Sequence, residues 1–206
     1  MTEHHNTQPP TESLSIIASG LTKRYGSTTA VEDLDLAISS GSVYGFLGPN
    51  GAGKTTSIRM LTGLMSPTSG TGQIMDQPIS NREALIPHIG YLPDSPPLYD
   101  EFTAREQLEY HGGLRDMEPS EIKDSIEKLL ARFDLTNDAE NRIGTYSTGM
   151  KQKTGLIQAM MHDPEVLFLD EPTSGLDPRA ARTVRETITE LAANDTTVFL
   201  STHILP

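Results

Sequence analysis

The segment GPNGAGKT, at residues 48–55, constrains this chain most because it fits the pattern GxxxxGK[ST]. It follows the apolar run VYGFL, which begins at Val43, and precedes SIRMLTGLM, which can form a helix. Glycines let the backbone curl so that its N–H groups point at phosphate oxygens, and the following helix turns its positive end to the same charge. The alternative is a Gly-rich turn with a chance lysine, which the strand–loop–helix context makes rare. The segment therefore predicts a phosphate-binding loop.

The ligand expected in this loop is ATP with Mg²⁺. Lys54 would neutralise the β- and γ-phosphate oxygens, and the Thr55 hydroxyl suits Mg²⁺, a hard ion that takes oxygen ligands. The residues that we expect to bind the nucleotide here are Gly48, Pro49, Asn50, Gly51, Ala52, Gly53, Lys54, Thr55 and Thr56.

Composition excludes several other functions. The 206 residues suit one domain with a subdomain, and a net charge of −12 argues against nucleic acid as a partner, although proteins from salty cytoplasms share this balance. The sequence has no cysteine, which rules out disulfides, thiolate metal sites and cysteine nucleophiles. No stretch approaches the ~18 apolar residues of a membrane-spanning helix, so a membrane role would need another polypeptide. We expect a cytoplasmic chain in which residues 1–12 form a flexible polar tail.

Apolar runs predict a layered α/β fold. The runs at Val43, Val166 and Thr197 lack polar alternation, which is typical of strands buried on both faces of a parallel sheet. Two further runs, at Leu14 and Ile89, also read as strands. Because helical patterns lie between the strands, we expect ligands beyond the carboxyl ends of the sheet.

One region of the chain is mostly helical. Strand signals disappear between residues 92 and 147, so we expect a helical subdomain at 92–153, inserted between core segments 13–91 and 154–206. Its clearest helix covers residues 121–133, where the spacing predicts one apolar face made of Ile122, Ile126, Leu129, Leu130 and Phe133.

Two adjacent acids, Asp170 and Glu171, end the apolar run VLFL where solvent begins. In phosphate-loop ATPases an acid at this place helps to hold Mg²⁺ through water, a role that falls to Asp170. Glu171 becomes the candidate to orient or deprotonate the attacking water. An acidic turn before Pro172 is the alternative, and the phosphate loop in the same chain argues against it.

Three further segments resemble the ATP-binding cassette family. YSTGMKQK at 146–153 is similar to the family signature, SGLD at 174–177 to the loop that couples two subunits, and LSTHIL contains His203 where the family keeps its switch histidine. The resemblance covers roughly residues 14–205. It implies a phosphate-loop NTPase of the RecA-like type, with an N-terminal antiparallel β part beside the layered sheet.

The resemblance also implies roles for individual residues. Ser147 and Gly149 match positions that contact the γ-phosphate of ATP held by the opposite subunit, although a capped helix start explains them locally just as well. His203 would hydrogen-bond the γ-phosphate and act in catalysis with Lys54 and Glu171. Tyr25 resembles the aromatic residue that stacks on adenine, although a tyrosine at a strand end is commonplace.

The function implied by the resemblance is that of an ATP-hydrolysing transporter subunit. Two copies would pair as a homodimer and drive a separate membrane-spanning permease from the inner face of the cell membrane. The sequences of three segments most resemble those of the branch that exports drugs, lipids and other small cargo, including gliding and copper-maturation systems. These segments are IGYLP, YSTGMKQ and DEPTSGLDP. One alternative is a soluble cassette ATPase of DNA repair or translation; the other is a nucleotide-binding module with little hydrolysis.

The sequence departs from the family pattern at two places. Asp94 stands where the family usually has a glutamine that binds Mg²⁺; its carboxylate can still supply oxygen to the metal, as Thr55 and Asp170 would. The chain also stops at Pro206, where the family continues with a helix and at least one strand. We therefore expect a C-terminally truncated fold that is marginally stable and hydrolyses ATP more slowly than a longer form.

Overall fold

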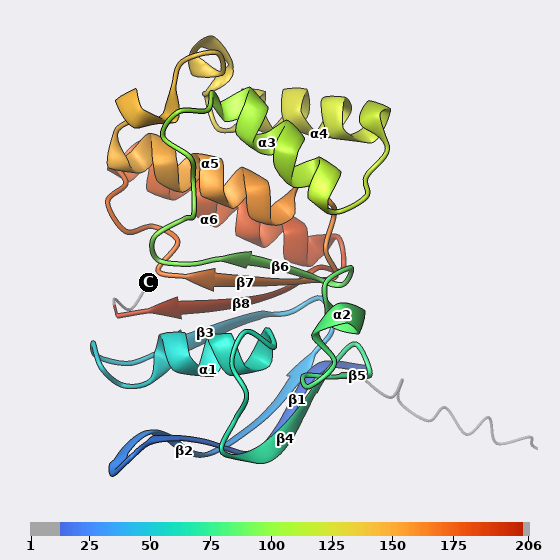
Figure 1. The fold of residues 1–206 in the computed structure, drawn as a ribbon, viewed down its shortest axis with the longest axis vertical. Helices are drawn as coiled ribbons and strands as arrows, with labels where there is room; N and C mark the ends of the chain where they lie inside the picture. The colour runs from blue at the N-terminus through green and yellow to red at the C-terminus, as the bar shows by residue number, and fades with distance from the viewer. Residues whose placement is uncertain (1–12, 204–206) are drawn as a thin grey trace, which may run out of the picture.

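The computed structural model describes residues 13–203, so the tail expected at 1–12 lies outside the described part. Two four-stranded sheets form the frame (Figure 1). The first is antiparallel, in the order β2–β1–β4–β5, with β1 Leu14–Tyr25, β2 Thr28–Ser39, β4 Ser69–Ile74 and β5 Gln77–Pro78. The second is parallel, in the order β3–β8–β7–β6, with β3 Val43–Leu47, β8 Thr197–Thr202, β7 Val166–Asp170 and β6 Ile89–Leu92.

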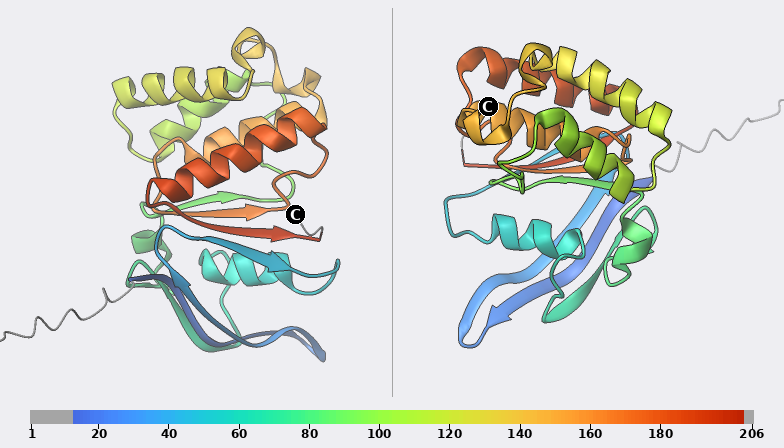
Figure 2. Two further views of the ribbon diagram at one scale, coloured as in Figure 1. Left: turned by 180° about the vertical axis from the view of Figure 1, so that it is seen from behind. Right: turned by 45° about the horizontal axis from the view of Figure 1, so that its top comes forward.

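Helices cover the parallel sheet on both faces. Helix α1, Lys54–Leu61, lies between the two sheets, and α5, Thr148–Met160, and α6, Pro178–Ala193, lie on the opposite face of the parallel sheet (Figure 2). The outer layer beyond them contains α3, Ala104–Leu114, and α4, Pro119–Arg132. A short α2, Arg82–Leu85, precedes β6, and two 3₁₀ turns, Thr136–Asp138 and Ile143–Thr145, lead to α5.

The outer helices begin and pack as their sequences predict. Helix α3 starts with a capping box in which Thr103 and Glu106 each bind the other's backbone N–H, and α4 has Pro119 in its first turn. The apolar face predicted for residues 121–133 is confirmed, because Ile126, Leu129, Leu130 and Phe133 are buried and Ile122 packs against the same cluster. This apolar face therefore packs α4 against the core.

The prediction that the Val43 strand is buried on both faces is wrong. Strand β3 lies at the edge of the parallel sheet, and Val43 and Leu47 are 46% and 48% exposed. An apolar run predicts a strand but does not show whether that strand lies at the centre or at the edge of its sheet. The prediction failed because β3 is an edge strand. The same prediction is confirmed for β7, whose residues are all buried between β6 and β8.

Aromatic packing fixes the strands that carry the site. Phe168 of β7 and Phe199 of β8 are fully buried, with ring centroids 5.6 Å apart. Tyr44 and Phe46 of β3 pack on Phe199 at 5.4 and 5.5 Å. Because these contacts hold three neighbouring strands in register, their carboxyl ends meet at one edge of the sheet.

The base of the helical layer is attached to the core by one arginine. The Arg115 guanidinium donates to the carbonyls of Ile86 at 2.8 Å and Ile89 at 3.3 Å, and to Nε2 of His111 at 3.1 Å; Nε2 of His162 lies 2.7 Å away. Burial, followed by the nearby Arg115 charge, lowers the pKa of His111 and of His162 to about 4. Both imidazoles are therefore neutral near neutral pH.

We expect the free energy of unfolding to fall as pH is lowered from 6.5 towards about 4. In this window the unfolded chain takes up protons on His111 and His162 while the folded chain does not. Each pKa unit of separation contributes about 1.4 kcal/mol, so one histidine accounts for about 3 kcal/mol. Urea unfolding across this pH range, for the unaltered chain and for His162→Gln, measures the effect. The variant should lose stability less steeply on acidification; equal slopes would contradict the assignment.

Candidate nucleotide-binding site

A cleft of about 450 Å³ opens at the carboxyl ends of the parallel strands, beside the loop that precedes α1. It brings together the phosphate-loop segment, Asp94, the two acids at the end of β7 (Asp170 and the following Glu171) and the histidine after β8. The residues that line it are Ala30, Pro49, Asn50, Gly51, Gly53, Lys54, Thr55, Thr56, Asp94, Asp170, Glu171, Ser174 and His203. Gly48 and Ala52 belong to the same loop but do not line the cleft.

The loop backbone has the curled form that glycine permits. Gly51 and Gly53 have φ of +83° and +86°, in the left-handed region. A Cβ at Gly53 would lie 2.4 Å from the Ala30 carbonyl oxygen, so the loop also passes too close to β2 for a larger residue. Helix α1 begins at Lys54 and has no acidic residue in its first turn, which leaves its positive end free to face an anion.

Lys54 is held in the cleft by its own loop. Its side chain is 7% exposed, and Nζ donates to the carbonyls of Gly48 at 2.6 Å and Pro49 at 3.2 Å. Nζ also lies 3.5 Å from Oε1 of Glu171. The lysine charge is therefore positioned between the phosphate loop and Glu171, the acid that follows β7.

Asp170 faces the loop from the end of β7. Thr55 Oγ1 donates to Asp170 Oδ2 at 2.7 Å, and Ser201 Oγ donates to Asp170 Oδ1 at 2.5 Å. A hydroxyl and a carboxylate in contact beside a phosphate loop are the hard oxygen donors that Mg²⁺ prefers, so these residues fit the ion.

Glu171 has a left-handed backbone conformation, and the two oxygens of its carboxylate have different surroundings. Its φ is +50°, a value that non-glycine residues seldom adopt. Its Oε2 lies 2.9 Å from Nδ1 of His203, whereas Oε1 is buried and has no hydrogen-bond partner within residues 13–203. A buried carboxylate oxygen without a donor is the acceptor that a water molecule in the cleft could use.

Outside the phosphate loop, the three residues predicted to bind nucleotide do not line the cleft. Tyr25 is 49% exposed, and its hydroxyl donates to Met65 Sδ at 3.0 Å. Ser147 caps α5 by accepting from the Met150 N–H at 3.3 Å, as the local alternative predicts, and Gly149 lies in the first turn of the same helix. Their nucleotide contacts remain predictions.

The structure adds three residues that the sequence did not mark as site residues. Ala30 lies on β2, a strand that the apolar runs in the sequence did not predict. Ser174 lies in the SGLD loop. Ser201 contacts Asp170 from β8. The feature of the sequence that could have identified Ser201 is its position: it is a hydroxyl residue at the end of the apolar run TVFLS, two residues before His203.

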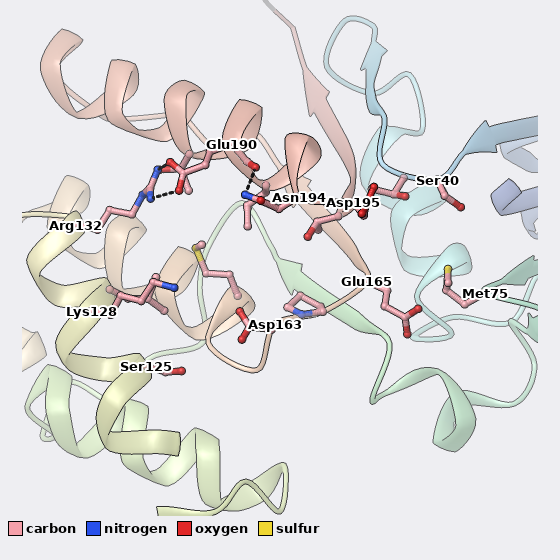
Figure 3. Close-up of a pocket in the computed structure, with 17 residues that line it drawn as sticks. Ser40, Met75, Ser125, Lys128, Arg132, Asp163, Glu165, Glu190, Asn194 and Asp195 are labelled. Carbon is pink, nitrogen blue, oxygen red and sulfur yellow. Dashed lines mark hydrogen bonds and ion pairs between the residues drawn. The ribbon is translucent and has the colours of Figure 1, made fainter. Parts of the chain in front are cut away.

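A second cleft, of about 600 Å³, lies at the amino ends of β7 and β8, at the opposite end of the parallel sheet from the first cleft (Figure 3). Arg132 of α4 pairs there with Glu190 of α6 at 2.6 Å and donates to Thr187 at 2.9 Å. It contains none of the predicted site residues. The ion pair instead attaches the outer helical layer to the core.

A parallel sheet with a phosphate loop after one strand and an acid pair after another defines a nucleotide-binding protein of the phosphate-loop class. The sequence model of the ABC transporter family matches residues 31–174. The chain therefore belongs to the ABC transporter family, as an ATP-binding cassette.

Individual relatives agree with this family. The chain is 41% identical to the bacitracin transport ATP-binding protein BcrA of Bacillus licheniformis, over 92% of this chain and 62% of the relative. It is 38% identical to the daunorubicin resistance ATP-binding protein DrrA3 of Streptomyces coeruleorubidus, over 93% and 61%. It thus spans about three fifths of the length of these relatives. A solved ATP-binding subunit of an ABC transporter superposes with a TM-score of 0.86 at 31% identity, over 94% of this chain and 80% of that structure.

We expect Gly53→Ala to destabilise the fold more than Gly51→Ala does. Both positions have a positive φ, which costs about 1–2 kcal/mol for alanine. A Cβ at Gly53 would also clash with the Ala30 carbonyl oxygen, whereas a Cβ at Gly51 meets nothing within 4 Å. The clash should add about 1–3 kcal/mol to the loss, which urea unfolding of both variants would measure. Equal losses would show that the approach to Ala30 does not restrict the loop.

Proposed function

We propose that this chain binds ATP with Mg²⁺ and hydrolyses it as the ATPase subunit of an ABC transporter. The observation that carries the proposal is the meeting of Lys54, Asp170 and Glu171 in one cleft at the strand ends. The names of relatives of this chain describe bacitracin transport, daunorubicin resistance and Nod factor export, and this favours export as the direction of transport.

The triphosphate would be held by the loop and by the metal. Backbone N–H groups of residues 48–56 and the amino end of α1 would bind the phosphate oxygens, and Lys54 would exchange the carbonyls of its own loop for phosphate. Thr55 and Asp170 would hold Mg²⁺, with the Asp94 carboxylate available from the same cleft. The metal would neutralise charge on the phosphate oxygens.

Glu171 would prepare the attacking water. Its Oε1 lies 3.5 Å from Lys54 Nζ and has no hydrogen-bond partner among the described residues, while Oε2 contacts His203, which holds the carboxylate in place. A carboxylate fixed in this way can accept a proton from water or orient it towards the γ-phosphate. His203 lines the same cleft and could hydrogen-bond the γ-phosphate directly.

A second copy of the chain would complete the site. Ser147 is exposed and lies outside its own cleft, so contact with a nucleotide requires a cleft on another subunit. The two segments expected at the subunit interface lie side by side, because a Cβ at Gly175 would be 3.1 Å from Thr148 Cγ2. A homodimer in which each signature segment faces the partner's phosphate loop accounts for both observations.

The transport role requires a membrane-spanning partner. Among residues 13–203 there is no helix with the length and apolarity to cross a bilayer. An aromatic surface on the helical layer, made of Tyr99, Phe102 and Tyr110, is suited to a partner because Tyr99 and Tyr110 are about half exposed and the rings lie 5.2–6.0 Å apart. We propose that the chain works at the cytoplasmic face of the membrane. A neighbouring gene that encodes about six membrane-spanning helices would favour transport over a soluble cassette ATPase.

Glu171→Gln should lower ATP turnover by about 10²–10⁴-fold because the amide cannot accept the proton of the attacking water. ATP binding should persist, and an ATP-bound dimer should appear on a sizing column. Glu186→Gln is the matched control, since Glu186 is exposed on α6, outside the cleft, and pairs with Arg182. Unchanged turnover in Glu171→Gln would defeat the catalytic assignment.

Lys54→Ala should weaken ATP binding itself, by about 10-fold or more, because a buried ammonium at the phosphate loop is removed. Calorimetric titration of the folded protein with Mg²⁺ and ATP measures the change. Lys128→Ala, in the cleft at the opposite end of the sheet, is the control and should bind as the unaltered chain does. An undiminished affinity in Lys54→Ala would remove the phosphate loop from the proposed function.

A further inference from the structure

Ser201 contacts both Asp170, the last residue of β7, and Glu171, which follows the strand, although it does not line the cleft. It is fully buried on β8, directly opposite Asp170 in the parallel register. Its hydroxyl donates to Asp170 Oδ1 at 2.5 Å and accepts from the Glu171 N–H at 3.2 Å. One side chain therefore contacts both the carboxylate of Asp170 and the backbone of Glu171.

The Asp170 carboxylate depends on this contact. It is 1% exposed, and among the described residues no cationic side chain forms an ion pair with it. Hydroxyl groups hold both of its oxygens, Thr55 on Oδ2 and Ser201 on Oδ1. When the Thr55 hydroxyl binds Mg²⁺ through an oxygen lone pair, as the proposed function requires, its O–H can remain on Oδ2, and Ser201 is the side chain that fixes the other oxygen, Oδ1. Leaving a buried carboxylate oxygen without a donor is costly.

Glu171 depends on the same residue for its backbone. Its left-handed φ of +50° turns the chain sharply at the end of β7. The N–H that follows Asp170 is shared between the backbone oxygen of Ser201 at 3.3 Å and its hydroxyl at 3.2 Å. His203, two residues further along the chain, contacts the Glu171 carboxylate. The segment that contains Ser201 and His203 thus constrains Glu171 at both its main chain and its side chain.

We propose that Ser201 is a positioning residue for Mg²⁺-dependent ATP hydrolysis, which orients the carboxylate of Asp170 towards the metal and the backbone of Glu171 towards the attacking water. The inference rests on the proposed function, because it assigns Ser201 a part in that same site. A buried serine with a purely structural role would affect stability alone. A positioning residue affects the dependence on Mg²⁺ and leaves binding of metal-free nucleotide as it was.

The decisive comparison is between Ser201→Ala and Ser57→Ala. Ser57 lies on α1, is equally buried, and its hydroxyl has no hydrogen-bond partner within the described residues, so its removal deletes a buried hydroxyl without breaking a contact. Calorimetric titration with ATP in the presence of EDTA should give the same affinity for both variants and the unaltered chain, within about 2-fold. The Mg²⁺ concentration for half-maximal ATP binding should rise about 10-fold in Ser201→Ala alone, the loss expected for a hydrogen bond to a charged group.

Turnover provides the second readout. The rate at saturating ATP and Mg²⁺ should fall about 10–100-fold in Ser201→Ala, and Ser201→Thr, which restores a hydroxyl, should recover to within about 3-fold. Ser201→Cys fills the side-chain position with a thiol, which is only a weak hydrogen-bond donor, so it should behave as Ser201→Ala does. It replaces Ser201→Ala in both experiments if that variant fails to fold.

Two results separate the inference from the proposed function. If the unaltered chain binds ATP but Ser201→Ala and Ser201→Cys keep its Mg²⁺ dependence and its rate, the positioning role is overturned and the proposed function stands. If the unaltered chain binds no ATP with Mg²⁺, the proposed function fails and the role of Ser201 in it fails as well.

Discussion

The hydrogen bond between Thr55 and Asp170 connects the two halves of the candidate site, because Thr55 lies at the start of α1 and Asp170 at the end of β7. These residues are separated by most of the chain and meet only because β3, β8 and β7 run parallel and end at one edge of the sheet. Packing of Phe168 against Phe199 keeps those strands in register. The position of the acids relative to the phosphate loop is thus a consequence of the aromatic core beneath them.

Three charged side chains of the cleft have polar partners within the chain. Loop carbonyls hold the Lys54 ammonium, hydroxyls hold the Asp170 carboxylate, and His203 occupies one oxygen of Glu171. Binding of a triphosphate therefore exchanges existing partners for phosphate oxygens, which lowers the net gain but leaves the side chains close to their required positions. In a chain with a net charge of −12, this local arrangement of one buried lysine and a helix amino end is what makes an anion site possible.

The outer helical layer is attached to the core by polar groups at its base and by apolar packing elsewhere. Arg115 bridges α3 to two backbone carbonyls, and Arg132 bridges α4 to Glu190 of α6. The layer also contains the exposed aromatic surface, while the signature segment begins α5 beside the SGLD loop. The surfaces proposed for a second subunit and for a membrane partner therefore belong to elements that contact the nucleotide-binding core directly.

Local patterns in the sequence determined much of this protein. The phosphate loop, the acid pair and the apolar face of the helix at 121–133 depend on neighbouring residues, since glycine conformation, strand ends and helical periodicity are short-range properties. Tertiary structure alone decided that the Val43 strand lies at a sheet edge, that Ala30 limits the loop at Gly53, and that Ser201 meets Asp170. These features depend on which strands pair and in which register, and pairing joins residues far apart in the chain, where no local pattern specifies the partner.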